Sequence, residues 1–138
     1  MNTNVAFNAT ESNTVTGNVA NSGGTITLTG PGTFYLEGSV GGLNPSNLSV
    51  GQARVYSGFY NIGTSSYFGQ GGQSSAGNAT NFDGIPNNSA NASITVASGS
   101  SVTVALRINY VNATAAISAQ SDFNTASLGQ AWVSVIKF

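Results

Sequence analysis

Short segments of the chain alternate apolar and polar residues with a period of two. Ile26 and Leu28 alternate with threonines, and the same pattern runs through residues 34–40 and 102–110. This period is typical of a β-strand with one buried face, because successive side chains of a strand point to opposite sides. Further strands are expected at residues 5–7, 53–61, 92–96, 115–119 and 131–138.

Turn residues separate these segments, and no window repeats apolar residues at helical spacing for three turns. The pattern therefore predicts an all-β fold. We expect a jelly-roll sandwich of two antiparallel sheets with about eight to ten strands.

Two segments depart from the alternation. Residues 1–23 are mostly polar and are interpreted as an N-terminal arm or an edge strand, which leaves residues 24–138 as the jelly-roll domain. Residues 70–91 are rich in Gly, Ser and Asn. We expect them to form a loop that is longer than most connections.

The segment that closes the chain is apolar on two sides. Trp132 and Ile136 fall on one face of the expected strand, and Val133 and Val135 fall on the other. One face must cover the core, so the other needs a second cover. The simplest cover is another subunit. A central strand beneath a long loop is the alternative.

Charge is scarce: three cationic and four acidic side chains make up 5% of the 138 residues, with a net charge of −1. Nucleic-acid binding and electrostatic membrane anchoring both need clustered cations. No stretch approaches the about 20 apolar residues of a membrane span. We therefore expect no nucleic-acid partner and no membrane. Low charge also removes a protection against self-association, which favours a role in assembly.

Catalytic chemistry finds little support. The chain has no histidine and no cysteine, which excludes His-based triads and zinc sites built on these ligands. The spacing pairs none of the carboxylates of Glu11, Glu37, Asp83 and Asp122. Asp83 precedes a glycine, and a turn explains that pair better than a calcium loop does. We expect no enzyme activity, no metal and no cofactor.

Three stretches resemble the jelly roll of the tumour-necrosis-factor-like family, including the globular heads of complement-type proteins. They are the turn and aromatic strand at 31–36, the alternating strand at 101–108, and the apolar strand at 129–136. The resemblance covers about residues 24–138 and implies a compact homotrimer, with the final strand central in the inner sheet near the threefold axis. The chain departs from the complement-type pattern in its few charges and its lack of a collagen-like stalk.

The resemblance implies the interface residues. In the family, the strands that carry Glu37 and Arg107 are neighbours in the inner sheet, so we expect these two to pair near the subunit interface. The alternative is two solvated charges. The expected trimer interface comprises Tyr35, Glu37, Ala105, Arg107, Trp132, Ser134 and Ile136.

Similar small jelly rolls occur as decoration, knob or spike proteins of bacteriophage particles. By this analogy the chain is expected to be a virion structural protein: a trimeric decoration (cement) protein on the capsid surface. Residues 1–7 do not read as a secretory signal, so we expect synthesis in the host cytoplasm. The partner would be the major capsid protein or another virion protein, contacted by an arm containing Asn4, Val5 and Phe7.

Two other roles stay open. The chain could be a receptor- or glycan-binding knob of a phage head or tail fibre, in which Tyr60, Tyr67 and Phe68 form a ligand loop that stacks on sugar. It could also be a bacterial surface or spore-coat interaction domain.

Overall fold

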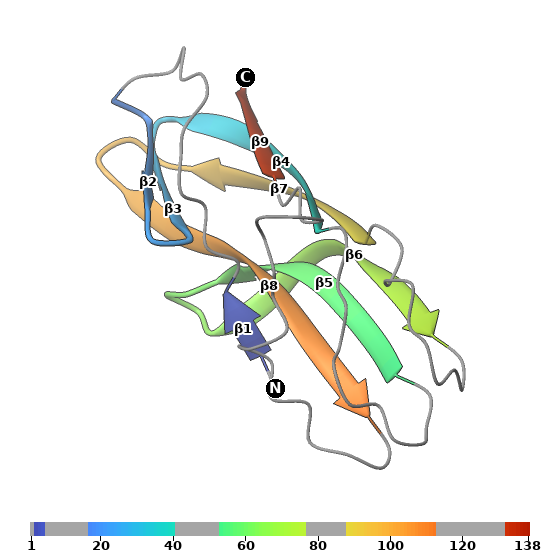
Figure 1. Ribbon diagram of the computed structural model, residues 1–138. Coiled ribbons are helices and arrows are strands. Elements are labelled where there is room, and N and C mark those ends of the chain that lie inside the picture. Colours follow the sequence, from blue (N-terminus) through green and yellow to red (C-terminus); the bar gives the residue numbers. More distant parts are fainter. Residues whose placement is uncertain (1, 5–16, 41–52, 77–87, 113–131) are drawn as a thin grey trace.

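The computed structural model describes residues 2–4, 17–40, 53–76, 88–112 and 132–138. Over these ranges the chain forms strands and no helix (Figure 1). The strands are β1 (Asn2–Asn4), β2 (Val19–Ser22), β3 (Thr25–Thr29), β4 (Gly32–Val40), β5 (Ala53–Asn61), β6 (Ser66–Ala76), β7 (Asn88–Val96), β8 (Ser101–Asn112) and β9 (Trp132–Lys137). The predicted all-β class is confirmed.

The strands form two antiparallel layers that share one core. The strand path is continuous, in the order β2-β3-β8-β5-β6-β7-β4-β9. Strands β2, β3, β8, β5 and β6 form the first layer, and β7, β4 and β9 form the second. The layers join where Gln70 of β6 pairs with Asn91 of β7. Strand β1 pairs with β8 outside this path. Figure 1 shows β4, β7 and β9 together on one side and β8 beside β5 on the other. The chain changes layer at every connection from β3 to β9 except β5–β6, an order compatible with a jelly roll.

The core lies between the layers and is built from the alternating apolar positions. Leu28, Phe34, Leu36, Phe59 and Leu106 are fully buried in it. These side chains come from β3, β4, β5 and β8, so both layers contribute. Because the strands alternate, the residues between them point outward, and these outward residues form the candidate sites.

The turn between β2 and β3 shows why its sequence contains two glycines. Ser22 pairs with Thr25 across the turn, and Gly23 and Gly24 have φ values of 55° and 85°. A two-residue hairpin turn of this kind needs positive φ at both central positions, which glycine adopts without steric cost. Residues 19–22, which lie in the polar N-terminal segment, end the strand order among the described residues.

The prediction of a long loop over residues 70–91 is wrong at both ends of this segment. Gln70–Ala76 continues β6, and residues 88–91 begin β7. A Cβ on Gly69 or Gly72 would collide with the backbone of β7, at Asn91 and Ser89 respectively. This strand is therefore rich in glycine because a neighbouring strand lies close, which a count of apolar residues does not detect. The strands expected at 5–7 and 115–119 lie outside the described residues.

Strand β9 differs from the position that the family resemblance implies. It pairs with β4 and ends the strand path in the part of the chain that the structure describes. The expectation of a central final strand is therefore not met within the described residues.

Candidate functional site

Strand β9 presents two different faces. Its side chains alternate between exposed and half-buried along the strand. Val133 and Val135 pack against the core, whereas Trp132 and Ile136 are 43% and 50% exposed. The sequence predicted an apolar strand that needs two covers. The core is one of them, and nothing among the described residues covers the other side fully.

The exposed side of β9 continues onto β4. In the register of these antiparallel strands, Tyr35 lies opposite Ile136 and Glu37 lies opposite Ser134. Tyr35 is half-buried and Glu37 is exposed. We call Tyr35, Glu37, Trp132, Ser134 and Ile136 the β9 face. The structure thus brings five of the predicted interface residues together on one surface.

The other two predicted interface residues lie in the opposite layer. Ala105 and Arg107 belong to β8, where Ala105 is fully buried and Arg107 is half-buried. Strand β8 pairs with β1, β3 and β5, whereas β4 pairs with β7 and β9. The expectation that Glu37 and Arg107 lie on neighbouring strands is therefore wrong, and the family analogy was its only basis.

Arg107 is held by other groups instead. Its Nε donates a hydrogen bond to Oδ1 of Asn4 at 2.6 Å. Its guanidinium carbon lies 3.5 Å from the centroid of the Tyr60 ring, the arrangement of a cation–π contact. Asn4, predicted as part of a capsid-contact arm, thus pairs with β8 of its own chain. Val5 and Phe7 of that arm lie outside the described residues.

Tyr60 and Tyr67 form a pair of rings on the outer face of the first layer. They are directly paired residues of β5 and β6. Their ring centroids lie 5.1 Å apart at 73°, an edge-to-face packing that suits the charge distribution of aromatic rings. Tyr67 remains 46% exposed. A fixed ring with a large exposed surface can contact a ligand.

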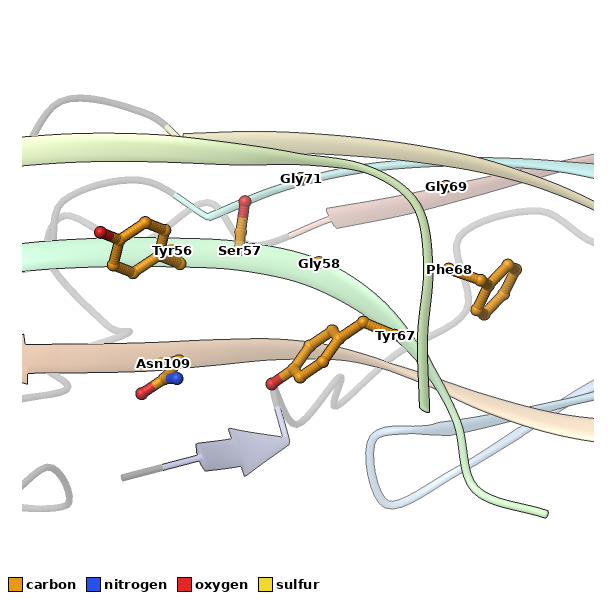
Figure 2. A pocket seen from close by; sticks show the side chains of 8 residues that line it. All are labelled: Tyr56, Ser57, Gly58, Tyr67, Phe68, Gly69, Gly71 and Asn109. Carbon is orange, nitrogen blue, oxygen red and sulfur yellow. The ribbon is translucent and has the colours of Figure 1, made fainter. Parts of the chain in front are cut away.

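A hollow of about 330 Å³ lies beside this pair and is lined by Tyr56, Gly58, Tyr67, Gly71 and Asn109, among others. Figure 2 shows Tyr56, Tyr67 and Asn109 on the same side of the strands, with the Tyr67 hydroxyl directed toward Asn109. Gly58 follows Tyr56 on β5, close to the Tyr67 ring that β6 contributes. We call this feature the tyrosine hollow.

The environment of Tyr67 changes its acidity. Burial of part of the phenol raises its pKa above the usual value of 10.0, because a phenolate loses hydration there. The Arg107 charge acts in the opposite direction, and the nearby Tyr60 adds to the rise. The hydroxyl is therefore neutral, and able to donate a hydrogen bond, at physiological pH.

The predicted ligand residues are only partly together. Tyr67 and Phe68 both line the tyrosine hollow, although Phe68 also packs against the core, near Phe59 at a centroid distance of 6.4 Å. Tyr60 packs on Tyr67 but is not among the residues that line the hollow. Asn109 was missed as a member of the site. The alternation of residues 53–61 could have indicated that Tyr56 shares a face with Tyr60, because both are outward positions of one strand.

Metal and membrane features were also sought in the described ranges. No group of three or more His, Cys, Asp or Glu residues able to hold a metal ion occurs there. Among the same residues, no helix has the length and apolar character needed to cross a bilayer.

Comparison of the chain with protein-family models, with curated proteins and with solved structures finds no match. The resemblance to the tumour-necrosis-factor-like family therefore stays a prediction.

Proposed function

We propose that this chain is a structural protein without catalytic activity, whose copies associate as a homotrimer through the β9 face. The observation that supports this most directly is the exposure of Trp132 and Ile136 on a strand whose opposite side lies on the core. Burying a large apolar side chain contributes about 1.5–3 kcal/mol. Several such residues on one surface favour association with another protein.

A second copy of the chain is the occupant that the charges favour. The net charge is −1, so copies repel each other weakly. Glu37 is the one charged residue of the β9 face, and we place it at the rim of the contact, where its carboxylate stays hydrated. Phe138, 78% exposed beside β4, extends the apolar surface.

At the level of the particle, we propose that the trimer is a capsid decoration protein of a phage, bound to the major capsid protein or another virion protein. A nearly uncharged polar surface loses little hydration free energy when it lies against a protein shell, which suits permanent attachment. Images of the particles test this step: hundreds of copies over the head support decoration, whereas tens of copies at fibre tips contradict it.

Light scattering tests the assembly step. The purified chain at tens of micromolar should have about three times the 13.9 kDa mass of one copy. Ile136→Ser should lower that mass toward one copy. Ile62→Ser is the matched control, because Ile62 is also an exposed isoleucine, 36% exposed, but lies just after β5. A wild-type mass of one copy, or equal effects of the two variants, contradicts the proposal.

A further inference from the structure

We propose that the tyrosine hollow binds an uncharged sugar as a single pyranose ring. This site lies on the outer face of the first layer, whereas the β9 face belongs to the second layer. The proposal therefore goes beyond assembly and does not depend on it.

The shape of the hollow fits a small ring. Its volume of about 330 Å³ is at the lower end of the range for small-molecule sites. Glycines in its lining allow the walls to pack closely: a Cβ on Gly58 would lie 3.0 Å from Cδ1 of Tyr67, and one on Gly71 would lie 2.5 Å from the Ser57 carbonyl oxygen. Larger residues at either position would displace a ring or a strand.

The chemistry of the lining fits an uncharged sugar. The face of a tyrosine ring carries partial negative charge and attracts the polarised C–H groups on the flat side of a pyranose. The Asn109 amide and the phenol hydroxyls can both donate and accept hydrogen bonds, as sugar hydroxyls require. None of the described residues that line the hollow is charged. Arg107, the cation described above, is engaged by Asn4 and Tyr60, so among the described side chains a phosphate or a carboxylate has no prepared partner there.

The Tyr67 ring is fixed before a ligand arrives. One side of it lies so close to Gly58 that an added Cβ there would be 3.0 Å from its Cδ1, its neighbour Tyr60 packs edge to face, and Arg107 holds Tyr60 in turn. A tyrosine that is already ordered loses little conformational entropy on binding. Tyr67 is thus the stacking residue, and Tyr60 is a positioning residue that acts through it.

Saturation-transfer NMR with methyl glycosides of glucose, galactose, mannose and N-acetylglucosamine tests the site, using the wild-type protein in its native oligomeric state. At least one glycoside should receive saturation, strongest at the ring C–H protons that face the tyrosine. Tyr67→Ala should weaken its affinity by about tenfold or more, the usual contribution of stacking on an aromatic ring. Tyr67→Phe should keep the affinity within about threefold, because the ring remains.

Tyr35→Ala is the matched control. It removes a tyrosine from the β9 face, so it should alter the mass in solution and leave glycoside binding unchanged. Tyr67→Ala should weaken glycoside binding and leave the mass in solution unchanged. The two variants together therefore distinguish failure of this site from failure of the proposed assembly. If Tyr67→Ala does not fold, Tyr56→Ala replaces it, because Tyr56 also lines the hollow and its loss should weaken glycoside binding.

Three results overturn the proposal. One is the absence of saturation transfer to every glycoside. Another is binding that neither Tyr67→Ala nor Tyr56→Ala weakens. The third is displacement of the glycoside by a proline-rich peptide that binds the same tyrosines more tightly, which would assign the hollow to a protein partner.

Discussion

Arg107 lies over the Tyr60 ring, with its guanidinium carbon 3.5 Å from the ring centroid. Arg107 also donates a hydrogen bond to Asn4, so one side chain links β1, β5 and β8. Arg107→Ala should lower the free energy of unfolding by about 1–3 kcal/mol, because both contacts are lost. Chemical denaturation at fixed protein concentration measures this change.

A double-mutant cycle isolates the contact between the two residues. Arg107→Ala combined with Tyr60→Leu should show a coupling energy of about 0.5–2 kcal/mol. Lys137 provides the comparison, since its Nζ lies 5.8 Å from the Phe34 ring centroid and should couple more weakly. Strictly additive effects of the Arg107 and Tyr60 substitutions would contradict the geometry.

The sequence predicted the strands in which alternation is strong. Residues 25–29 form β3, and Leu28 is fully buried as the pattern requires. Strand β6 was missed because several of its positions are glycines. These glycines let β7 lie close to β6, but they do not produce the alternation of apolar and polar residues that predicts a strand. Pairing between strands distant in sequence, as for Glu37 and Arg107, is not encoded in local periodicity and was taken wrongly from a resemblance.

A buried polar contact joins the two layers. The Ser57 hydroxyl of β5 donates to Oδ1 of Asn88 of β7 at 2.8 Å, and the two residues are 4% and 2% exposed. Ser57→Ala should lower the free energy of unfolding by about 1–3 kcal/mol, because a buried acceptor loses a donor. Thermal and urea unfolding should both report the loss.

Thr33 and Thr95 offer the matched control. Their hydroxyls also lie within hydrogen-bond distance, at 2.9 Å, but at an exposed position. Thr33→Ala should cost at most about 1 kcal/mol, since water replaces the lost contact. Equal losses for Ser57→Ala and Thr33→Ala would mean that burial does not control the strength of the Ser57 contact.

Two glycines with positive φ should respond differently to alanine. Gly23 has a φ of 55° with no atom within 4 Å of an added Cβ, whereas Gly69 has a φ of 75° and an added Cβ would meet the Asn91 carbonyl and Ala92. Gly23→Ala should cost about 1–2 kcal/mol from backbone strain alone. Gly69→Ala should cost at least about 2 kcal/mol more, because β6 must move away from β7. Urea unfolding separates the two, and a smaller effect at Gly69 would contradict the close packing of β6 on β7.

The candidate sites were only partly predictable from the sequence. Alternation placed Trp132 and Ile136 on one face of the last strand and Val133 and Val135 on the other, and it required a second cover for one of these faces. The structure shows that Val133 and Val135 lie on the core and that Trp132 and Ile136 are exposed. The tyrosine hollow depends on which residues of β5, β6 and β8 lie side by side. That register is set by long-range pairing, so Asn109 could not be assigned to the site from its local pattern.

The raised pKa of Tyr67 predicts a loss of stability at high pH. Burial favours the neutral phenol in the folded state, and the unfolded chain ionises near the usual value of 10.0. The contribution of Tyr67 to stability is therefore fully present below about pH 10 and is lost as the pH rises through the raised folded pKa. Unfolding by urea between pH 8 and 11 should show a steeper decline for the wild type than for Tyr67→Phe.

The ionisation of Tyr67 can be measured directly by phenolate absorbance. Subtracting the titration curve of Tyr67→Phe from that of the wild type isolates the contribution of Tyr67. That difference should titrate at a higher pH than a free tyrosine. Arg107→Gln should raise the pKa of Tyr67 further, because the guanidinium charge acts to lower it, and Tyr60→Phe should lower it, because Tyr60 acts to raise it. A titration of Tyr67 below pH 10, or a downward shift in Arg107→Gln, would show that burial does not dominate at this ring.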